Sequence, residues 1–201
     1  KYGVYNNYGM DKDKLKDLLL FYSSTQKKLV TLKEYVDRML EEQKSIYYAC
    51  GETIDKIDLL PQVEAIKDKG YEILYLTDNV DEFVFQVLMT YNEKTFKNVS
   101  SDDIDLDTEE EKEELKKANE DSKDLLSSML EILKGEVQAV KFTHRLKNHP
   151  VCLSSEGALS IEMQKTLNAM PNNNQEIKAQ TVLEINENHE IAKKLKLIQD
   201  D

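Results

Sequence analysis

The sequence predicts an α/β fold that is α+β overall, with a small helix-covered parallel sheet joined by a long helix to a second small α+β domain. Two observations predict it. In the first half, short apolar runs typical of buried strands alternate with segments of helical periodicity, and parallel strands need such crossovers. After Gly135 the pattern changes to two strand-like runs followed by helix, strand and helix. We expect domains over 1–108 and 135–201, with a linking helix over 109–134.

The first predicted helix has a clear start signal. In Thr31-Leu32-Lys33-Glu34 the threonine hydroxyl can accept a hydrogen bond from the first helical turn while Glu34 reaches back, which is a capping box. The residues on its apolar face are Leu32, Tyr35, Val36, Met39 and Leu40. Residues 46–50 form an aromatic and apolar run before Gly51, which predicts a buried strand.

Two more strands and two more helices are expected in this domain. Pro61 at the first helical position and Gly70 just past the end bound a short helix. Residues 71–77 have the composition of a strand, Asp78 or Asn79 can cap a helix over 80–91, and residues 95–99 are a third strand candidate.

Negative charge is concentrated between the two domains. Residues 102–124 contain 12 acidic residues and 4 lysines, a local charge of −8 out of a total of −12. A loop is expected over 101–107 and a long helix from Thr108 to Gly135, with an apolar stripe in its second half: Leu125, Leu126, Met129, Leu130 and Leu133. We interpret the charge run as the solvated face of a helix that links two domains, and an acidic docking site is the alternative.

The second domain is expected to open with an antiparallel strand pair. Its strands cover 137–143 and 151–155 and are separated by a turn over 147–150. A helix over 159–170 and a break over 171–174 follow. A strand over 181–185 and a last helix over 189–197 complete the domain.

The composition excludes several classes of function. A hydrophobic fraction of 40% in 201 residues can form a core, and a net charge of −12 repels phosphate backbones and anionic membrane surfaces, so no nucleic-acid or membrane partner is expected. No apolar run approaches the roughly 20 residues that span a bilayer. Cys50 and Cys152 are too few for a disulfide framework, which fits a cytoplasmic protein. Because the chain starts at Lys1, we expect a piece of a longer protein.

No catalytic constellation stands out, so the chain is expected not to be an enzyme and to hold no cofactor or metal. The six glycines stand apart, which excludes a glycine-rich phosphate loop. His144, His149 and Cys152 have spacings of five and three, but no second cysteine pair accompanies them, so we interpret them as turn and strand residues. Cys50 can be a nucleophile only if histidine and asparagine meet it in space, and a small buried side chain is the commoner case.

Two predicted helices carry informative apolar faces. In the helix over 80–91 the stripe is Val80, Val84, Val87, Leu88 and Tyr91. Phe83 lies at its margin, whereas Phe85 and Met89 point to the opposite side, so some of these aromatic side chains are expected outside the core. The helix over 159–170 has Leu159, Met163, Thr166, Leu167 and Met170 on one face. That face either packs on its own sheet or stays exposed, where flexible methionines suit varied apolar partners.

Collinear stretches carry a further signal. They are Val30-Thr31-Leu32-Lys33-Glu34-Tyr35 with Ile46-Tyr47-Tyr48 and Gly51-Glu52, Gly70-Tyr71-Glu72-Ile73-Leu74-Tyr75 with Val80-Asp81-Glu82-Phe83, Val140-Lys141-Phe142-Thr143-His144-Arg145-Leu146, and Leu183-Glu184-Ile185-Asn186 with His189. In this order they resemble the heat-shock protein 90 chaperone family, bacterial type, over nearly the whole chain.

The resemblance implies an internal piece of such a chaperone: the end of the middle domain, a linking helix and the start of the C-terminal domain. It places the ATP and Mg²⁺ site and a catalytic arginine upstream, and the helices of the homodimer downstream. It also implies binding of unfolded or partly folded client proteins. The implied client-binding residues are Phe83, Leu159, Met163, Leu167 and Met170. Many bacterial relatives have tryptophan where Phe83 stands, and Thr166 replaces a larger apolar residue.

Three hypotheses of function follow. The first is a non-catalytic, client-binding part of an ATP-dependent chaperone. The second is a small α/β nucleotide-binding or regulatory domain that uses Asp78 and Asp81 at the carboxyl end of a strand. The third is a purely structural connector.

Overall fold

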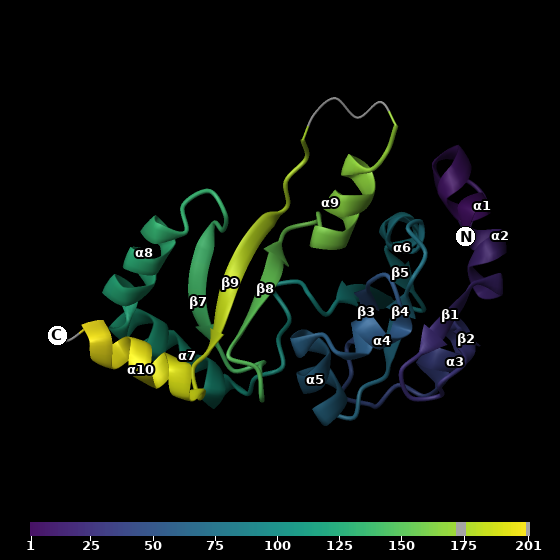
Figure 1. Cartoon of the computed structure of the whole chain (residues 1–201). Helices are drawn as coiled ribbons and strands as arrows, with labels where there is room; N and C mark the ends of the chain where they lie inside the picture. The colour runs from purple at the N-terminus through teal and green to yellow at the C-terminus, as the bar shows by residue number, and fades with distance from the viewer. Residues whose placement is uncertain (172–175, 200–201) are drawn as a thin grey trace. The chain divides into compact units, whose positions relative to one another are not determined.

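The chain divides into two compact units in the computed structural model, which describes residues 1–171 and 176–199 (Figure 1). Unit 1 comprises Lys1–Val99 with residues 165–171, and unit 2 comprises Ser100–Gln164 with residues 176–199. The described residues thus form an α+β structure with one sheet in each unit, which confirms the predicted fold class. No helix in this part of the chain is long and apolar enough to cross a membrane.

Unit 1 is built on a mixed sheet with the strand order β2-β1-β4-β3-β6-β5. Its strands are β1 (Leu20–Ser23), β2 (Leu29–Thr31), β3 (Ser45–Cys50), β4 (Ile73–Leu76), β5 (Thr90–Tyr91) and β6 (Lys94–Asn98). Its helices are α1 (Tyr2–Tyr5), α2 (Lys12–Leu15), α3 (Leu32–Asp37), α4 (Ile54–Asp58), α5 (Pro61–Asp68) and α6 (Asp81–Leu88), with 3-10 turns η1 (Asn6–Gly9) and η2 (Lys16–Leu18). The predicted strands β4, β3 and β6 pair in parallel, whereas β1, β2 and β5 extend the sheet by antiparallel pairing that was not predicted.

The sequence signals predicted for the ends of α3 and α5 are confirmed. The Thr31 hydroxyl accepts from the Glu34 N–H at 3.1 Å, and the Glu34 carboxylate accepts from the Thr31 N–H at 2.8 Å, so the capping box forms. Pro61 begins α5, and Gly70 follows its end with φ +76°. Leu40 is 42% exposed, because α3 ends at Asp37 and the apolar face predicted for it does not continue that far.

Helix α6 differs from the prediction at both ends. It begins at Asp81 after the N-cap Val80, which makes no side-chain cap, so neither Asp78 nor Asn79 caps it. It ends at Leu88, because Met89 takes φ +63° and the chain turns into β5.

Phe85 on this helix is buried, which corrects its predicted place outside the core. Its exposed fraction is 2%, and its ring centroid lies 4.7 Å from that of Phe21, 5.0 Å from Tyr48 and 4.1 Å from Phe96. Five of the eight residues of α6 are buried, and Asp81, Glu82 and Phe85 among them lie outside the predicted stripe, so the stripe deduced from periodicity underestimates the buried face. Met89, by contrast, is 69% exposed.

Unit 2 is built on a sheet with the strand order β7-β9-β8. Its strands are β7 (Ala139–Thr143), β8 (Val151–Glu156) and β9 (Gln180–Asn186), and its helices are α7 (Glu109–Asp121), α8 (Lys123–Ile132) and α10 (Glu190–Gln199). Helix α9 (Ile161–Asn168) contains the division between the units, after Gln164. Residues 100–107, hereafter the connector, precede α7. The break predicted over 171–174 lies, apart from Pro171, outside the described residues.

The predicted antiparallel pairing of 137–143 with 151–155 is wrong. Strand β9 lies between them, parallel to β7 and antiparallel to β8. The turn over 147–150 does not close a hairpin, because the Asn186 side-chain amide at the end of β9 donates to the Lys147 and His149 carbonyls, both at 3.1 Å. The buried Val182 and Ile185 give β9 the apolar character of a central strand.

The long helix predicted between the domains is divided at Ser122, where φ is −104° and ψ is 18°. Its first part, α7, begins at a capping box of Thr108 and Glu111 and has no buried residue. The second part, α8, packs its apolar stripe with β7 and α10 around Leu126, Phe142 and Ile185. The expectation of a solvated start and a packed end is therefore confirmed. The division is at a buried serine, 5% exposed.

Candidate functional site

Phe83 lies on α6 in unit 1 and is half-buried. Its ring makes an edge-to-face contact with Tyr5 of α1, with ring centroids 5.8 Å apart. Tyr5 is 44% exposed and Tyr2 is 67% exposed, so α1 adds aromatic surface that the sequence analysis did not include. Phe83 is thus part of an aromatic surface formed by α1 and α6.

The remaining predicted residues lie on α9 and next to its ends. Leu159 and Leu167 are half-buried, Met170 is 44% exposed and Met163 is 9% exposed. The Ser160 hydroxyl accepts from the Met163 N–H at 3.0 Å and so caps the first turn. Leu159, Leu167 and Met170 therefore offer apolar area, while Met163 offers little.

These five residues do not belong to one unit. Phe83, Leu167 and Met170 fall in unit 1, and Leu159 and Met163 fall in unit 2. Within unit 1, Phe83 belongs to the aromatic surface of α1 and α6, while Leu167 and Met170 lie at the end of α9 and just after it.

The carboxylates proposed for a nucleotide site are engaged by an amine. The Lys1 ammonium lies 2.9 Å from Asp78 and 2.8 Å from Asp81. Burial raises the pKa of the Asp81 carboxyl, which is 1% exposed, although the hydrogen bond and charge of Lys1 act in the opposite direction. Among the described residues, no three His, Cys, Asp or Glu side chains are placed to hold a metal ion.

The residues with metal-like spacing have other partners. His144 Nε2 lies 3.0 Å from the Glu187 carboxylate, in a turn after β7. Cys152 is buried in β8, and burial raises the pKa of its thiol to about 12. A thiol that stays protonated at neutral pH is a poor nucleophile and a poor metal ligand.

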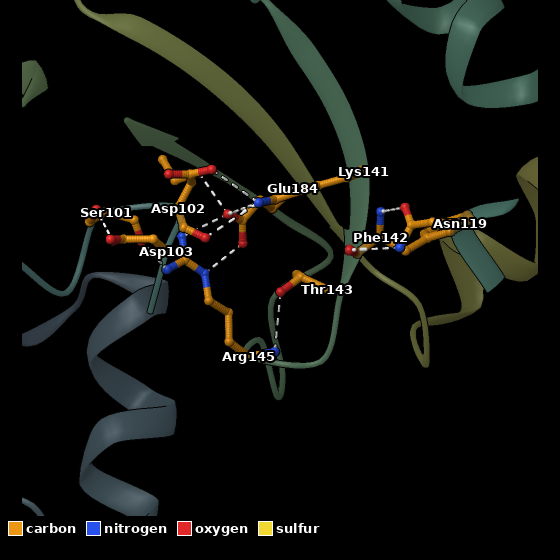
Figure 2. A network of polar contacts seen from close by, with 10 residues as sticks. Ser101, Asp102, Asp103, Asn119, Lys141, Phe142, Thr143, Arg145 and Glu184 are labelled. Carbon is orange, nitrogen blue, oxygen red and sulfur yellow. Dashed lines mark hydrogen bonds and ion pairs between the residues drawn. The ribbon is translucent and has the colours of Figure 1, made fainter. Parts of the chain in front are cut away.

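A buried ion pair in unit 2 was not predicted. Arg145 Nε and Nη2 donate to the two oxygens of Glu184 at 2.5 and 2.9 Å, and Ser154 Oγ donates to the same carboxylate at 2.7 Å. The two charged side chains are 6% and 1% exposed. They lie on the face of the sheet opposite the apolar core, together with Lys141 and Asp102 (Figure 2). We call Arg145, Glu184, Lys141 and Asp102 the polar network.

A cavity of about 290 Å³ adjoins the polar network. Its walls come from the connector, from α7 and from β7, and include Ile104, Leu106, Leu115, Lys116, Lys141 and Phe142. The edge of β7 beside it is covered by Asn119 of α7, whose side-chain amide accepts from the Phe142 N–H at 2.9 Å and donates to the Phe142 carbonyl at 3.4 Å.

One feature of the sequence could have indicated the polar network, namely an acidic residue within an apolar strand. Glu184 stands between Leu183 and Ile185 in a predicted strand, and a carboxylate at a buried strand position needs a cationic partner. Nothing in the sequence identifies Arg145, 39 residues away, as that partner.

Comparisons with known proteins agree along the whole chain. The family model described as Hsp90 protein matches residues 1–201. The chain is 58% identical over 196 residues to Chaperone protein HtpG of Clostridium perfringens, 57% identical to that of Clostridium botulinum and 54% identical to that of Bacillus velezensis. Each alignment covers 98% of this chain and 31% of the relative, so the chain spans about a third of the length of these relatives.

Proposed function

The chain belongs to the Hsp90 protein family, and on that premise we propose that it is a non-catalytic, client-binding part of a longer ATP-dependent chaperone. The exposed apolar side chains of unit 1 support this proposal best. Phe83 with Tyr5, and Leu167 with Met170, are half-buried or exposed apolar side chains of a strongly charged chain. Unfolded proteins expose apolar side chains that such surfaces can bury.

The binding that this surface supports is weak and reversible. Fully burying a Phe, Leu or Met side chain contributes about 1.5–3 kcal/mol, and a half-buried one contributes about half of that. Ordering and association costs reduce the sum further. A few such contacts give a surface from which a client can leave, which a chaperone requires.

For the rest of the longer protein, our proposal follows the family resemblance. ATP and Mg²⁺ bind outside this chain, helices outside it form a homodimer, and the protein acts in the cytoplasm. Residues 1–108 then correspond to the small subdomain of the middle domain, 109–134 to the linking helix and 135–201 to the start of the C-terminal domain. Closure of the dimer moves its client contacts and so favours some client conformations by differential binding.

The residues of this chain do not fit a magnesium nucleotide. Lys1 lies between the Asp78 and Asp81 carboxylates, and no metal-holding cluster of His, Cys, Asp or Glu occurs among residues 1–171 and 176–199. Phosphate would also meet a net charge of −12. No step of the proposed function therefore passes through a nucleotide on this chain.

A light-scattering assay tests the proposal. The 201-residue chain is added to a reporter protein that aggregates on mild heating, and the concentration that halves the scattering is measured. We expect Phe83→Ser to raise this concentration about fivefold, because it removes about 1 kcal/mol of apolar contact. The pair Leu167→Ser with Met170→Ser removes about 2 kcal/mol and should raise it about thirtyfold. The matched control is Leu59→Ser, which removes a side chain that is 77% exposed.

The outcomes separate the hypotheses. Equal protection by all variants, with circular dichroism showing that they are folded, would remove these side chains from the client surface. If the unaltered chain neither protects nor binds the reporter, the structural-connector hypothesis is favoured. Saturable binding of MgATP in calorimetry would favour the nucleotide hypothesis.

A further inference from the structure

The connector is held on the sheet of unit 2 as if it were a short extra strand. The Ser155 N–H donates to the Ser100 carbonyl and the Asp102 N–H donates to the Ser155 carbonyl, both at 3.0 Å, and Ser101 forms a parallel bridge with Ser155. Because Val99 is the last residue of this part of unit 1, these bonds hold the chain where it passes from one unit into the other. Two backbone hydrogen bonds alone form and break easily at a sheet edge.

Side chains of the polar network reinforce this short pairing. Arg145 Nη1 donates to the Ser101 carbonyl at 2.5 Å, and the Lys141 ammonium donates to both the carbonyl and the carboxylate of Asp102 at 3.3 Å (Figure 2). The connector is therefore bonded through its backbone to β8 and through cationic side chains to β7 and to the turn that follows it.

Glu184 holds Arg145 in the position that this contact requires. Two parallel N–H···O bonds to one carboxylate fix the plane of a guanidinium as well as its position, which a single contact cannot do. With Nε and Nη2 bonded to Glu184, Nη1 is directed at the Ser101 carbonyl. Glu184 thus acts on the connector through Arg145, since its own side-chain hydrogen bonds are to Arg145 and Ser154.

Charged side chains of the polar network and Lys112, which border the neighbouring cavity, are paired within the protein. Arg145 pairs with Glu184, Lys141 with Asp102, and Lys112 with Asp105 at 2.8 Å and Glu109 at 2.7 Å. The cavity therefore presents no buried unpaired charge from these groups to a ligand. The apolar part of its wall comes from Ile104 and Leu106 of the connector and from Leu115 of α7. The cavity therefore lies between α7 and the second half of the connector.

We propose that Arg145 and Glu184 form a latch that fastens residues 100–103 to the sheet of unit 2 and so couples the motion of the two units. With the latch closed, the chain leaves unit 1 directly into a fixed edge of the second sheet. With the latch open, the eight residues of the connector are a flexible tether that can extend to about 26–29 Å. Helix α9, which also crosses the division between the units, is then the remaining ordered connection, and the units move with more freedom.

Hydrogen exchange tests the local part of the proposal. In Glu184→Gln, we expect the amides of Asp102 and Ser155 to exchange at least tenfold faster, with Phe142 and Leu126 unchanged. The matched control is Lys112→Gln, which breaks an exposed ion pair on the same connector and is expected to leave the Asp102 and Ser155 amides unchanged.

A second variant covers the case in which Glu184→Gln unfolds the sheet. Arg145→Lys keeps a cation for Glu184 but loses the planar fork that reaches Ser101. It should accelerate exchange at Asp102 and Ser155 while β9 stays protected. Unchanged exchange at Asp102 and Ser155 in a folded variant, or equal acceleration by Lys112→Gln, would overturn the latch.

Spin labels test the coupling itself. Labels at Lys69→Cys in unit 1 and Lys193→Cys in unit 2, in a Cys50→Ser background, report the distribution of distances between the units, since both lysines are exposed. We expect this distribution to broaden in Arg145→Lys and to keep its width in Lys112→Gln. A width that Arg145→Lys leaves unchanged would refute the coupling even if the connector amides exchange faster.

Discussion

The hydroxyl of Tyr35 joins three parts of unit 1, and its removal should destabilise that unit. Tyr35 is fully buried on α3. Its hydroxyl donates to the Glu72 carbonyl at 2.6 Å and accepts from the Tyr47 N–H at 3.0 Å and from Gln43 Nε2 at 2.8 Å. Burial raises the pKa of this hydroxyl, so it is a neutral donor and acceptor at neutral pH.

The expected cost of Tyr35→Phe follows from the groups that lose this partner. The Glu72 carbonyl and the Tyr47 N–H each lose a buried hydrogen bond, at about 1–2 kcal/mol apiece. Gln43 Nε2 keeps the Ser45 carbonyl at 2.8 Å and adds little. The ring is retained, so no cavity larger than one oxygen atom forms. We expect the free energy of unfolding to fall by about 2–4 kcal/mol.

Urea denaturation of the 201-residue chain, followed by tyrosine fluorescence and circular dichroism, measures this change. The control is Tyr71→Phe, because Tyr71 is half-buried, stacks on Tyr47 with centroids 5.6 Å apart and makes no hydrogen bond through its hydroxyl within the described residues. The control should change the free energy by less than about 0.5 kcal/mol. A loss below about 1 kcal/mol for Tyr35→Phe, or one equal to the control, would refute the reasoning.

Two further changes test other parts of unit 1. Burial raises the pKa of the Asp58 carboxyl, but hydrogen bonds from Lys67 and Tyr75 outweigh burial and hold that pKa below its ordinary 3.8. The charged Asp58 carboxylate therefore stabilises the folded protein fully at pH values above the pKa that this carboxyl has in the unfolded chain. This stabilisation is lost as the pH falls through the lower pKa that it has in the folded protein. Asp58→Asn should lower the free energy of unfolding by about 0.5–1 kcal/mol at neutral pH and by less near pH 2, and equal losses in urea titrations at both pH values would contradict this. Phe85→Ala should lower the free energy of unfolding by about 3–5 kcal/mol in the same titration at neutral pH, and Met89→Ala should lower it by less than about 0.5 kcal/mol. Similar losses for the two variants would contradict the burial of Phe85.

Elements whose signals are local could be predicted from the sequence. The capping box of α3, the proline and glycine that bound α5, and the apolar runs of β3 and β4 each depend on a few neighbouring residues. The parallel pairing of β4, β3 and β6 followed because helices separate these strands in the sequence. The antiparallel strands β1 and β2 have only four and three residues, too short for a period of two to be recognised.

Pairing in unit 2 could not be predicted, because its central strand comes last in the chain. Strands β7 and β8 are neighbours in sequence and lie on opposite sides of β9. A turn sequence between two strands predicts that the chain reverses its direction there. It does not predict whether another strand lies between the two in the sheet. Of the candidate client-binding residues, the sequence grouped Met163 with Leu167 by helical spacing, whereas their exposure depends on packing that spacing alone does not describe.

The placement of charge in unit 2 explains why the polar network could not be predicted from the acidic residues of the sequence. The many carboxylates of α7 lie in water, where each ion pair contributes about 0–1 kcal/mol, so their number carries little structural information. The single carboxylate of Glu184 lies among buried residues, where loss of its partner costs about 3–5 kcal/mol. Glu184, which is one of 39 acidic residues in the chain, thus fixes Arg145 and, through it, the connector. Among the described residues of unit 2, burial rather than charge density therefore identifies Glu184 as the acidic residue whose substitution should alter how the two units move.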